Sequence, residues 1–265
     1  MTLKREIKMT KTIAIVNQKG GVAKTTTALA LGHGLAASGK KILLIDFDPQ
    51  GSLTTFLGYD TSDVPTAIEW LGVQRKHVAA FDDVVLNVNA NLDLIPSDIS
   101  LEEAPGYLYS KPGGHGYLLA VISEIKDRYD YVIIDTSPSL NILTINALVA
   151  ADELIVPFKP EVGSVKGISL LLDTIRDVRA LNRSIRIAGF VVVMADKRRK
   201  QALKENVDYI RGVARENGTK VYDSMIRASA SATRLTKEDL FTRGTAASDD
   251  YAAFVQEYLK GENKQ

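Results

Sequence analysis

Residues 17–26, NQKGGVAKTT, combine glycine, lysine and threonine at a spacing that suits phosphate binding. Gly20 and Gly21 can adopt backbone angles that turn successive N–H groups toward one point. The Lys24 ammonium can then reach the β- and γ-phosphates of a nucleotide, and the hydroxyl of Thr25 can bind magnesium. This stretch therefore predicts a loop that binds nucleotide phosphates together with Mg²⁺.

The spacing departs from the common phosphate-loop pattern, which requires glycine where this chain has Gln18 and Ala23. The context is still the one that such a loop needs, because an expected strand (12–17) precedes it and an expected helix (25–38) follows it. The N-terminus of that helix adds partial positive charge at the phosphate position. The alternative is a tight turn with a solvated lysine.

Two acidic motifs supply further groups for the same chemistry. Asp46 and Asp48 end an apolar run in LLIDFDPQGS (43–52), and Asp135 ends another in YVIIDTSPS (131–139). Ligands of open α/β sheets bind beyond the carboxyl ends of the strands, so these acids should meet the glycine loop at one edge. A carboxylate placed there reaches magnesium, usually through water. Taken alone, each acid could equally be a turn residue.

Short apolar runs alternate with helical stretches along the chain, and most runs are continuous, as in strands buried on both faces. The expected strands are 12–17, 41–46, 91–96, 131–135, 153–158, 187–195 and 220–226, and the expected helices are 25–38, 164–181, 201–216 and 249–260. This order predicts an α/β fold with a doubly wound, mostly parallel sheet flanked by helices. We expect a single domain over 11–260, a flexible N-terminal extension (1–10), a C-terminal tail (261–265) and an exposed loop at 105–116.

The composition excludes several classes of protein. Of the 265 residues, 45% are hydrophobic and 25% charged, and the formal net charge is +1, so nucleic-acid binding would need a local basic patch. No apolar run approaches the roughly 18 residues of a transmembrane helix, and the N-terminus lacks the apolar segment of a secretory signal. The absence of cysteine excludes disulfides and cysteine-ligated iron–sulfur clusters. We therefore expect a cytoplasmic protein.

The motifs together resemble those of the ParA/MinD ATPases, whose phosphate loop is a deviant Walker A box. The segments that carry the resemblance are KGGVAKTT (19–26), DFDPQGS (46–52) and YVIIDTSPSLNILTINAL (131–148). The family's loop permits Ala23, whereas Thr136 and Ser137 depart slightly from its Walker B pattern. The resemblance is specific over about residues 11–181 and implies a P-loop NTPase fold that binds ATP and Mg²⁺ and hydrolyses ATP slowly.

The resemblance also implies roles for single residues. Lys19 matches the family's signature lysine, which reaches the nucleotide of a partner subunit, whereas Lys24 serves the nucleotide of its own chain. Asp48 matches the switch aspartate tied to hydrolysis, Asp135 matches the Walker B magnesium residue, and Asp46 is expected to be a buried orienting acid. The implied nucleotide-binding residues are Lys19, Gly20, Gly21, Val22, Ala23, Lys24, Thr25 and Thr26; the catalytic residues are Lys19, Lys24 and Asp48; and the metal-binding residues are Thr25, Asp48 and Asp135.

The family recognises adenine partly through a loop after a late strand, often reading Ile-Pro-Arg-Asn. The nearest stretch in this chain, SMIRASASATRL (224–235), lacks the proline and the asparagine. By position in that stretch, the candidate base contacts are Met225, Ile226 and Ala228.

The family divides according to what the ATP-bound dimer binds, and the C-terminal helix bears on that choice. MinD proteins attach to membranes through such a helix. In this chain its apolar stripe is Tyr251, Phe254, Val255, Tyr258 and Leu259, but acidic residues flank the stripe where a membrane-surface helix carries Lys and Arg. We therefore expect the stripe to pack into the core.

Basic residues favour DNA as the surface that the dimer binds. The expected DNA-binding residues are Lys197, Arg198, Arg199, Lys200, Arg227 and Arg234, which can contact phosphates without reading sequence. A solvated loop and helix face is the alternative explanation of such a run.

The resemblance implies a partition ATPase. ATP would drive formation of a homodimer that binds non-specific DNA on the nucleoid, and a ParB-like centromere-binding partner would stimulate hydrolysis. The alternative is a MinD-like or cargo-positioning ATPase that runs the same cycle on a membrane or another surface. A phosphotransferase also remains open, although no acceptor site is evident, whereas an iron–sulfur relative is disfavoured because there is no cysteine.

Overall fold

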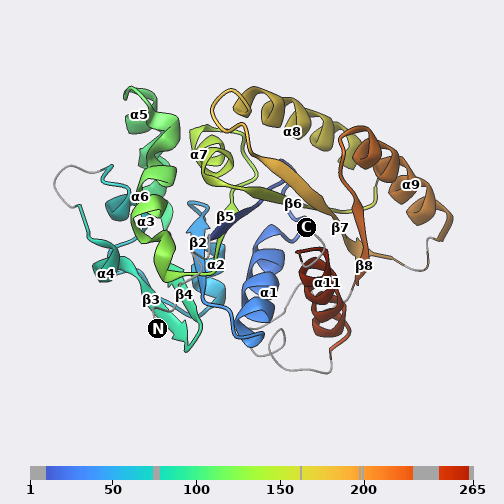
Figure 1. The fold of residues 1–265 in the computed structure, drawn as a ribbon, viewed down its shortest axis with the longest axis horizontal. Helices are drawn as coiled ribbons and strands as arrows, with labels where there is room; N and C mark the ends of the chain where they lie inside the picture. Colours follow the sequence, from blue (N-terminus) through green and yellow to red (C-terminus); the bar gives the residue numbers. More distant parts are fainter. Residues whose placement is uncertain are drawn as a thin grey trace, which may run out of the picture.

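The computed structural model describes residues 10–73, 78–161, 163–196, 198, 200–228 and 245–262. Within these residues, eight strands form one sheet in the order β3-β4-β2-β5-β1-β6-β7-β8 (Figure 1). The strands are β1 (Lys11–Ile15), β2 (Ile42–Phe47), β3 (Leu86–Asn89), β4 (Leu92–Ile95), β5 (Tyr131–Thr136), β6 (Glu153–Phe158), β7 (Arg186–Ala195) and β8 (Val221–Arg227). The expected doubly wound, mostly parallel sheet is confirmed, since β3 alone of these strands pairs antiparallel, with β4.

Helices cover both faces of the sheet (Figure 1). They are α1 (Lys24–Ala37), α2 (Ser52–Phe56), α3 (Ala67–Trp70), α4 (Phe81–Val84), α5 (Ala104–Tyr109), α6 (Tyr117–Ile125), α7 (Ile142–Ala150), α8 (Ser164–Val178), α9 (Lys200–Glu216) and α11 (Ala246–Glu262), with 3-10 turns at Ile99–Glu103, Gly114–Gly116 and Lys126–Arg128. Alternate side chains of each strand enter different cores. In β1, Ile13 packs with α1 and α11, whereas Ala14 packs with α7 and α8 on the other face.

The sequence pattern predicted every strand of this sheet except β3, and it missed the helices α2 to α7. The strand β3 has only four residues, which alternate between partly buried and exposed, so its alternation is as short as a strand signal can be. The start of α7 did carry a local signal, because the side chain of Asn141 accepts hydrogen bonds from the backbone N–H groups of Leu143 and Thr144, as helix-capping residues do.

The expectation of an exposed loop at 105–116 is wrong for much of that stretch. Helix α5 and a 3-10 turn occupy it, because Pro105 stands in the first turn of α5, where proline costs no hydrogen bond. Gly114 is buried against the Leu108 carbonyl so closely that a Cβ would clash. Here proline and glycine mark a helix start and a close backbone approach rather than a loop.

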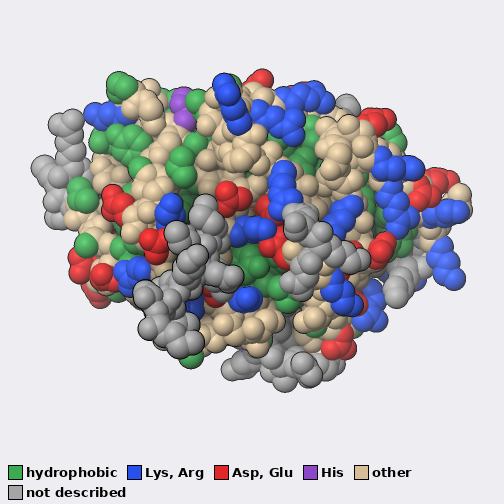
Figure 2. Space-filling view, viewed as in Figure 1, with side chains coloured by type: hydrophobic (Ala, Val, Ile, Leu, Met, Phe, Trp, Pro, Cys, Tyr) green, Lys and Arg blue, Asp and Glu red, His purple; other side chains and the backbone are tan. Residues whose placement is uncertain are grey.

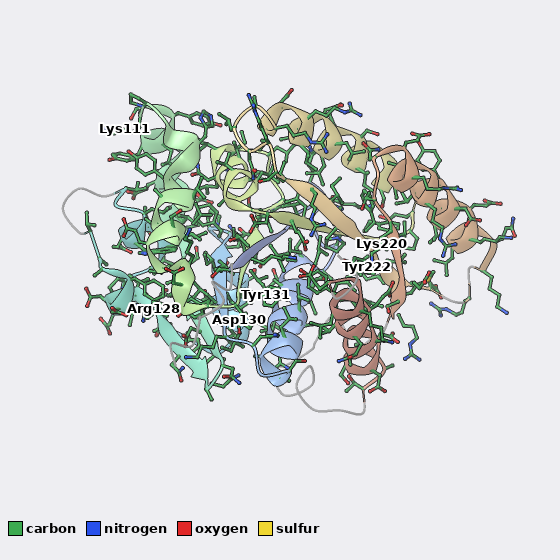
Figure 3. The ribbon with its side chains drawn as sticks, viewed as in Figure 1. Lys111, Arg128, Asp130, Tyr131, Lys220 and Tyr222 are labelled. Carbon is green, nitrogen blue, oxygen red and sulfur yellow. The ribbon has the colours of Figure 1, made fainter. Side chains whose placement is uncertain are left out.

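The C-terminal helix α11 packs into the core, as expected. Tyr251, Phe254, Val255 and Tyr258 are each at most 3% exposed, and the Phe254 ring meets Tyr222 of β8 edge-on at 5.0 Å. The Nζ of Lys220 lies over the Tyr222 ring, 4.5 Å from its centre (Figure 3). Among the described residues, no helix is both long and apolar enough to cross a membrane.

Two helix glycines provide a matched test of this packing. A Cβ on Gly34 of α1 would lie 2.8 Å from both methyl groups of Val255, so we expect Gly34→Ala to destabilise the fold by about 1–3 kcal/mol through overpacking. At Gly212 of α9, no described atom lies within 4 Å of the added Cβ, apart from that helix's own backbone. Gly212→Ala should instead stabilise by about 0.5–1 kcal/mol. Chemical denaturation measures both, and equal effects would contradict the tight α1–α11 contact.

Candidate nucleotide-binding site

The glycine loop joins the carboxyl end of β1 to the N-terminus of α1 in the conformation expected of a phosphate-binding loop. Gly21 has φ +69° and Ala23 has φ +55°, and a positive φ at a residue other than glycine is strained. Thr27 secures the turn, because its backbone N–H and its hydroxyl both donate to the carbonyl of Ala23, at 2.9 and 2.7 Å. The first turn of α1 thus points its backbone N–H groups toward the loop.

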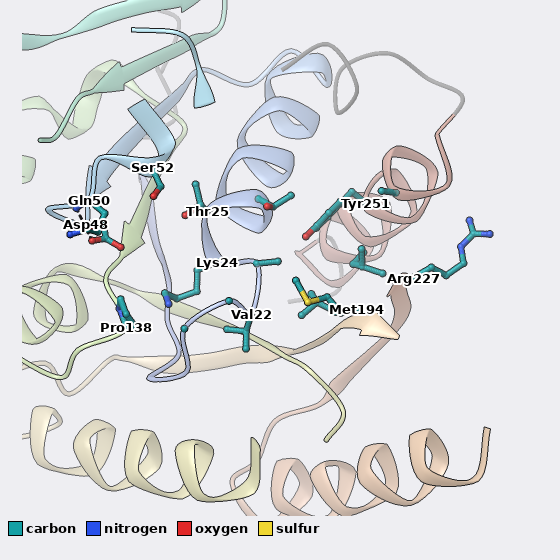
Figure 4. A pocket seen from close by; sticks show the side chains of 17 residues that line it. Val22, Lys24, Thr25, Asp48, Gln50, Ser52, Pro138, Met194, Arg227 and Tyr251 are labelled. Atoms are coloured by element: carbon teal, nitrogen blue, oxygen red, sulfur yellow. Dashed lines mark hydrogen bonds between the residues drawn. The ribbon is translucent and has the colours of Figure 1, made fainter. Parts of the chain in front are cut away.

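A pocket of about 370 Å³ lies along this loop. Its lining residues are Gly20, Gly21, Val22, Ala23, Lys24, Thr25, Thr26, Asp48, Gln50, Ser52, Pro138, Val193, Met194, Ile226, Arg227, Ala247 and Tyr251. Figure 4 shows two distinct ends: Asp48, Gln50 and Pro138 lie at one, and Met194, Arg227 and Tyr251 at the other. The Lys24 side chain extends toward the first end (Figure 4).

Asp135 lies beneath the loop at the end of β5 and is fully buried. Among the described residues, no hydrogen bond of ordinary geometry reaches either of its carboxylate oxygens. Burial and the neighbouring charge of Asp46 raise its pKa well above the usual value, and the nearby Thr25 hydroxyl and Lys24 only partly oppose this rise. Buried polar groups normally have partners, so this carboxylate suits a ligand or ion at the loop.

Asp46 and Asp48 differ in what they do. Asp46 is fully buried, and its oxygens accept hydrogen bonds from the N–H and the hydroxyl of Thr54 (2.9 and 2.8 Å) and from the N–H of Asp48 (3.3 Å). Burial raises the pKa of Asp46 to about 6. Asp48 instead lines the pocket, with Oδ1 accepting only from the Gln50 N–H (3.0 Å) among the described residues. Asp46 is thus buried and bonded to the backbone of Asp48, whereas Asp48 lines the pocket. The orienting role of Asp46 and the hydrolytic role of Asp48 stay predictions.

Lys24 is 7% exposed, and burial lowers its pKa while the charges of Asp135 and Asp48 raise it. An anionic group in the pocket would offset the cost of burying this ammonium. The arrangement of one cation, three carboxylates and a row of backbone N–H groups is therefore suited to a ligand that carries phosphate and a divalent cation together.

The residues of this pocket fit Mg²⁺ only when a phosphate-bearing ligand is bound as well. Among the described residues, no group of three or more His, Asp or Glu side chains is placed to hold a metal ion. Mg²⁺ usually binds through one or two carboxylates, waters and substrate phosphates. Thr25, Asp48 and Asp135 could supply the protein's share, with Asp135 acting from below the pocket.

The structure brings most of the expected nucleotide-binding residues together. Gly20 to Thr26 and Ile226 line the pocket, but Lys19, Met225 and Ala228 do not. Met225 packs against the core on the other face of the sheet, because neighbouring residues of a strand point to opposite sides. The N–H of Ala228 donates to the carbonyl of Ala195 at 3.0 Å.

At the far end of the pocket, the sequence predicts Ile226 but not Met194 or Tyr251. Met194 has φ +54°, a strained backbone geometry that no residue pattern predicts. Tyr251 comes from α11, and its hydroxyl lies 3.2 Å from that of Thr27. Tyr251 belongs to the apolar stripe of that helix, and it both packs in the core and lines the pocket.

The expected DNA-binding residues are only partly visible. Lys197, Arg199 and Arg234 lie outside the described residues. Arg198 is 90% exposed and paired with Asp196, and Lys200 begins α9. Lys and Arg side chains are frequent over α8 and α9, with acidic residues among them (Figure 2).

Arg227 is the expected DNA contact with the most extensive protein contacts. Its guanidinium forms a two-point ion pair with Asp250 of α11, with Nε–Oδ2 and Nη2–Oδ1 distances of 2.8 Å. Nη2 also donates to the Ala246 carbonyl. This pairing ties the end of β8 to the start of α11, so a DNA contact by Arg227 stays a prediction.

Comparison with known proteins agrees with a P-loop ATPase of the class that this fold and loop define. A family model described as an AAA domain matches residues 10–187. The chain is 38% identical over 221 residues to the chromosome-partitioning ATPase Soj of Treponema pallidum, covering 82% of this chain and 83% of Soj. It is 37% identical over 253 residues to the chromosome partitioning protein ParA of Caulobacter vibrioides, covering 94% and 91%.

Among solved structures, the chain is similar to cobyrinic acid a,c-diamide synthase of Mycobacterium smegmatis with a bound ATP analogue and magnesium. The TM-score is 0.81 at 28% identity, over 96% of both chains. The chain belongs to the ParA-type ATPases.

Proposed function

We propose that this chain is a DNA-segregation ATPase in which Mg²⁺ and ATP drive the pairing of two copies, and that the pair binds DNA without reading its sequence. The observation that carries the proposal is the buried Asp135 carboxylate, which lies beneath a lysine-bearing phosphate loop and receives no hydrogen bond of ordinary geometry from the described residues. The identity with partition proteins, 37–38% over most of the chain, supports the segregation role.

Each end of the pocket suits one part of ATP. Lys24, Thr25 and the loop N–H groups would hold the phosphates, and Lys24 would neutralise charge on the β- and γ-phosphates. Ile226, Met194 and Tyr251 offer an apolar surface of the kind on which a purine base rests. This assignment corrects the expected base contacts in part, because Ile226 keeps its place while Met194 and Tyr251 join it.

The three acidic residues Asp46, Asp48 and Asp135 would have different roles in binding Mg²⁺ and in hydrolysis. Mg²⁺, when bound, would offset the negative charge of the nucleotide phosphates. Thr25 and Asp135 would hold it, with Asp135 ionised once the cation is present. Asp48 would orient the attacking water, because it is the carboxylate that reaches the pocket. Asp46 would keep the segment of Asp48 in place through its hydrogen bonds to Asp48 and Thr54.

Lys19 would act on the nucleotide of the second copy. It does not line its own pocket, where Lys24 would already serve the phosphates. A cation supplied by a partner at the transition state is the role that an arginine finger plays in other nucleotide hydrolases. ATP would then join the two copies, and hydrolysis, stimulated by a ParB-like partner, would separate them.

The DNA surface would be a basic patch that includes Arg198 and Lys200, and the protein would associate with the nucleoid in the cytoplasm. The membrane alternative is less well supported, since the apolar stripe of α11 is buried against α1 and β8. That helix would have to leave the core before it could insert into lipid.

DNA binding measured with ATP, with ADP and without nucleotide tests this proposal. We expect tight DNA binding only when Mg²⁺ and ATP are both present. The logarithm of the DNA affinity should fall with the logarithm of the salt concentration, with a slope near 0.9 per phosphate neutralised. Arg198→Ala combined with Lys200→Ala should weaken binding on every DNA sequence alike. Glu124→Ala on exposed α6 is the control that changes surface charge elsewhere. Equal DNA affinity in all nucleotide states would contradict the proposal.

A further inference from the structure

Lys19 is held away from the nucleotide pocket by an acid from a distant part of the chain. The pocket is lined by every residue from Gly20 to Thr26 but not by Lys19. The Lys19 ammonium instead donates to Oε1 of Glu161, which lies between β6 and α8. Lys19 must therefore leave Glu161 before it can reach any phosphate, whether of its own copy or of another.

Hydrogen bonds hold the backbone at both residues of this ion pair. The Lys19 N–H donates to Oδ1 of Asn17 (2.9 Å), and Nδ2 of Asn17 donates to the carbonyl of Pro157 at the end of β6 (2.8 Å). Glu161 lies in a turn, and its backbone carbonyl accepts a hydrogen bond from the Ser164 N–H at 2.9 Å. The backbone thus brings the two side chains together, and only their side-chain torsions need to change for the pair to open.

Glu161 is shared between two lysines. Its Oε2 accepts from Lys159 at 2.8 Å while Oε1 accepts from Lys19. The pKa of Glu161 is lowered, first by the hydrogen bond from Lys159 and then by that from Lys19. Lys19 and Glu161 are each about one-third exposed, at 32% and 38%, so the ion pair is weak enough to exchange for a stronger anion.

We propose that Glu161 is a positioning residue that holds Lys19 back in the single copy and releases it to phosphate when two ATP-bound copies meet. This inference rests on the function proposed above. A nucleotide phosphate carries more negative charge than one carboxylate and attracts the ammonium more strongly. Glu161 therefore raises the concentrations of nucleotide and protein at which two copies pair, but it does not prevent pairing.

The inference predicts opposite effects for two substitutions around one carboxylate. Glu161→Gln should strengthen Mg²⁺–ATP-dependent dimerisation by about 2- to 30-fold, since an exposed ion pair is weak and each dimer opens two of them. Lys159→Gln should weaken dimerisation, because Glu161 would then attract Lys19 alone. Sedimentation of the full chain with a non-hydrolysable ATP analogue and Mg²⁺ measures both constants. The gain in Glu161→Gln should shrink in high salt, which screens the pair in the unsubstituted chain.

Glu124→Gln, an exposed substitution on α6 with the same change of charge, is the control and should leave dimerisation unchanged. If the unsubstituted chain never dimerises with the analogue, the proposed function fails. If it dimerises but Glu161→Gln is unchanged or weaker, or both substitutions shift dimerisation in the same direction, the role given to Glu161 is overturned. A thermal unfolding curve on each variant verifies that it is folded.

Discussion

Lys19→Ala should abolish nucleotide-dependent dimerisation while the single copy still binds ATP. Lys19 does not line its own pocket, so its loss removes no phosphate contact in the same chain. In the dimer it would remove two buried cation–phosphate contacts, and such contacts cost on the order of 2–5 kcal/mol each when one partner is deleted. Because a cation in trans also stabilises the transition state, hydrolysis should fall on the order of 10³-fold.

Two measurements separate ATP binding from dimerisation. Titration gives the nucleotide affinity of the single copy, and sedimentation with an ATP analogue gives the extent of dimerisation. Lys41→Ala is the matched control, because Lys41 is exposed and precedes β2 at the opposite edge of the sheet. A Lys19→Ala chain that dimerised normally would contradict the assigned role. A chain that lost ATP binding in the single copy would place Lys19 in its own site instead.

Asp48→Ala should bind Mg²⁺ and ATP but hydrolyse ATP about 10²- to 10⁴-fold more slowly, the range for loss of a group that assists proton transfer. Asp48 is the one carboxylate of the three site acids that lines the pocket in the described structure. Its hydrolysis-deficient form should therefore accumulate as a DNA-binding dimer. Single-turnover hydrolysis and DNA binding measured on the same sample check both parts.

Asp48→Asn distinguishes chemistry from local folding, because the amide oxygen can still accept the hydrogen bond from the Gln50 N–H. We expect Asp48→Asn to be nearly as slow as Asp48→Ala. Asp60→Ala, at an exposed turn beyond α2, should hydrolyse ATP normally. Full activity in Asp48→Asn would show that the carboxylate charge is not needed.

Local features made the phosphate end of the site predictable. The loop is contiguous in sequence, and its neighbours in space are the ends of apolar strands. Asp46 and Asp135 stand side by side in the register of β2 and β5, as expected when parallel strands end at one edge. The expected strands and the four expected helices follow from continuous apolar runs and from helical periodicity in the same way.

The base end and the Lys19 contact depend on chain packing that no short pattern encodes. Tyr251 reaches the pocket because α11 fits closely against Gly34 of α1, more than 200 positions earlier. Met194 depends on one strained φ angle. Glu161 meets Lys19 across a sequence separation of 142 residues, through the pairing of β1 with β6. Single-sequence patterns carry no information on such tertiary contacts.

The mass of the chain in solution shows whether ATP switches it from one copy to two. Sedimentation velocity of the unsubstituted chain, with Mg²⁺ and either a non-hydrolysable ATP analogue, ADP or no nucleotide, gives the mass in each state. We expect a dimer with the analogue and a monomer of 28.9 kDa in the other two conditions. The same mass in all three conditions would contradict it.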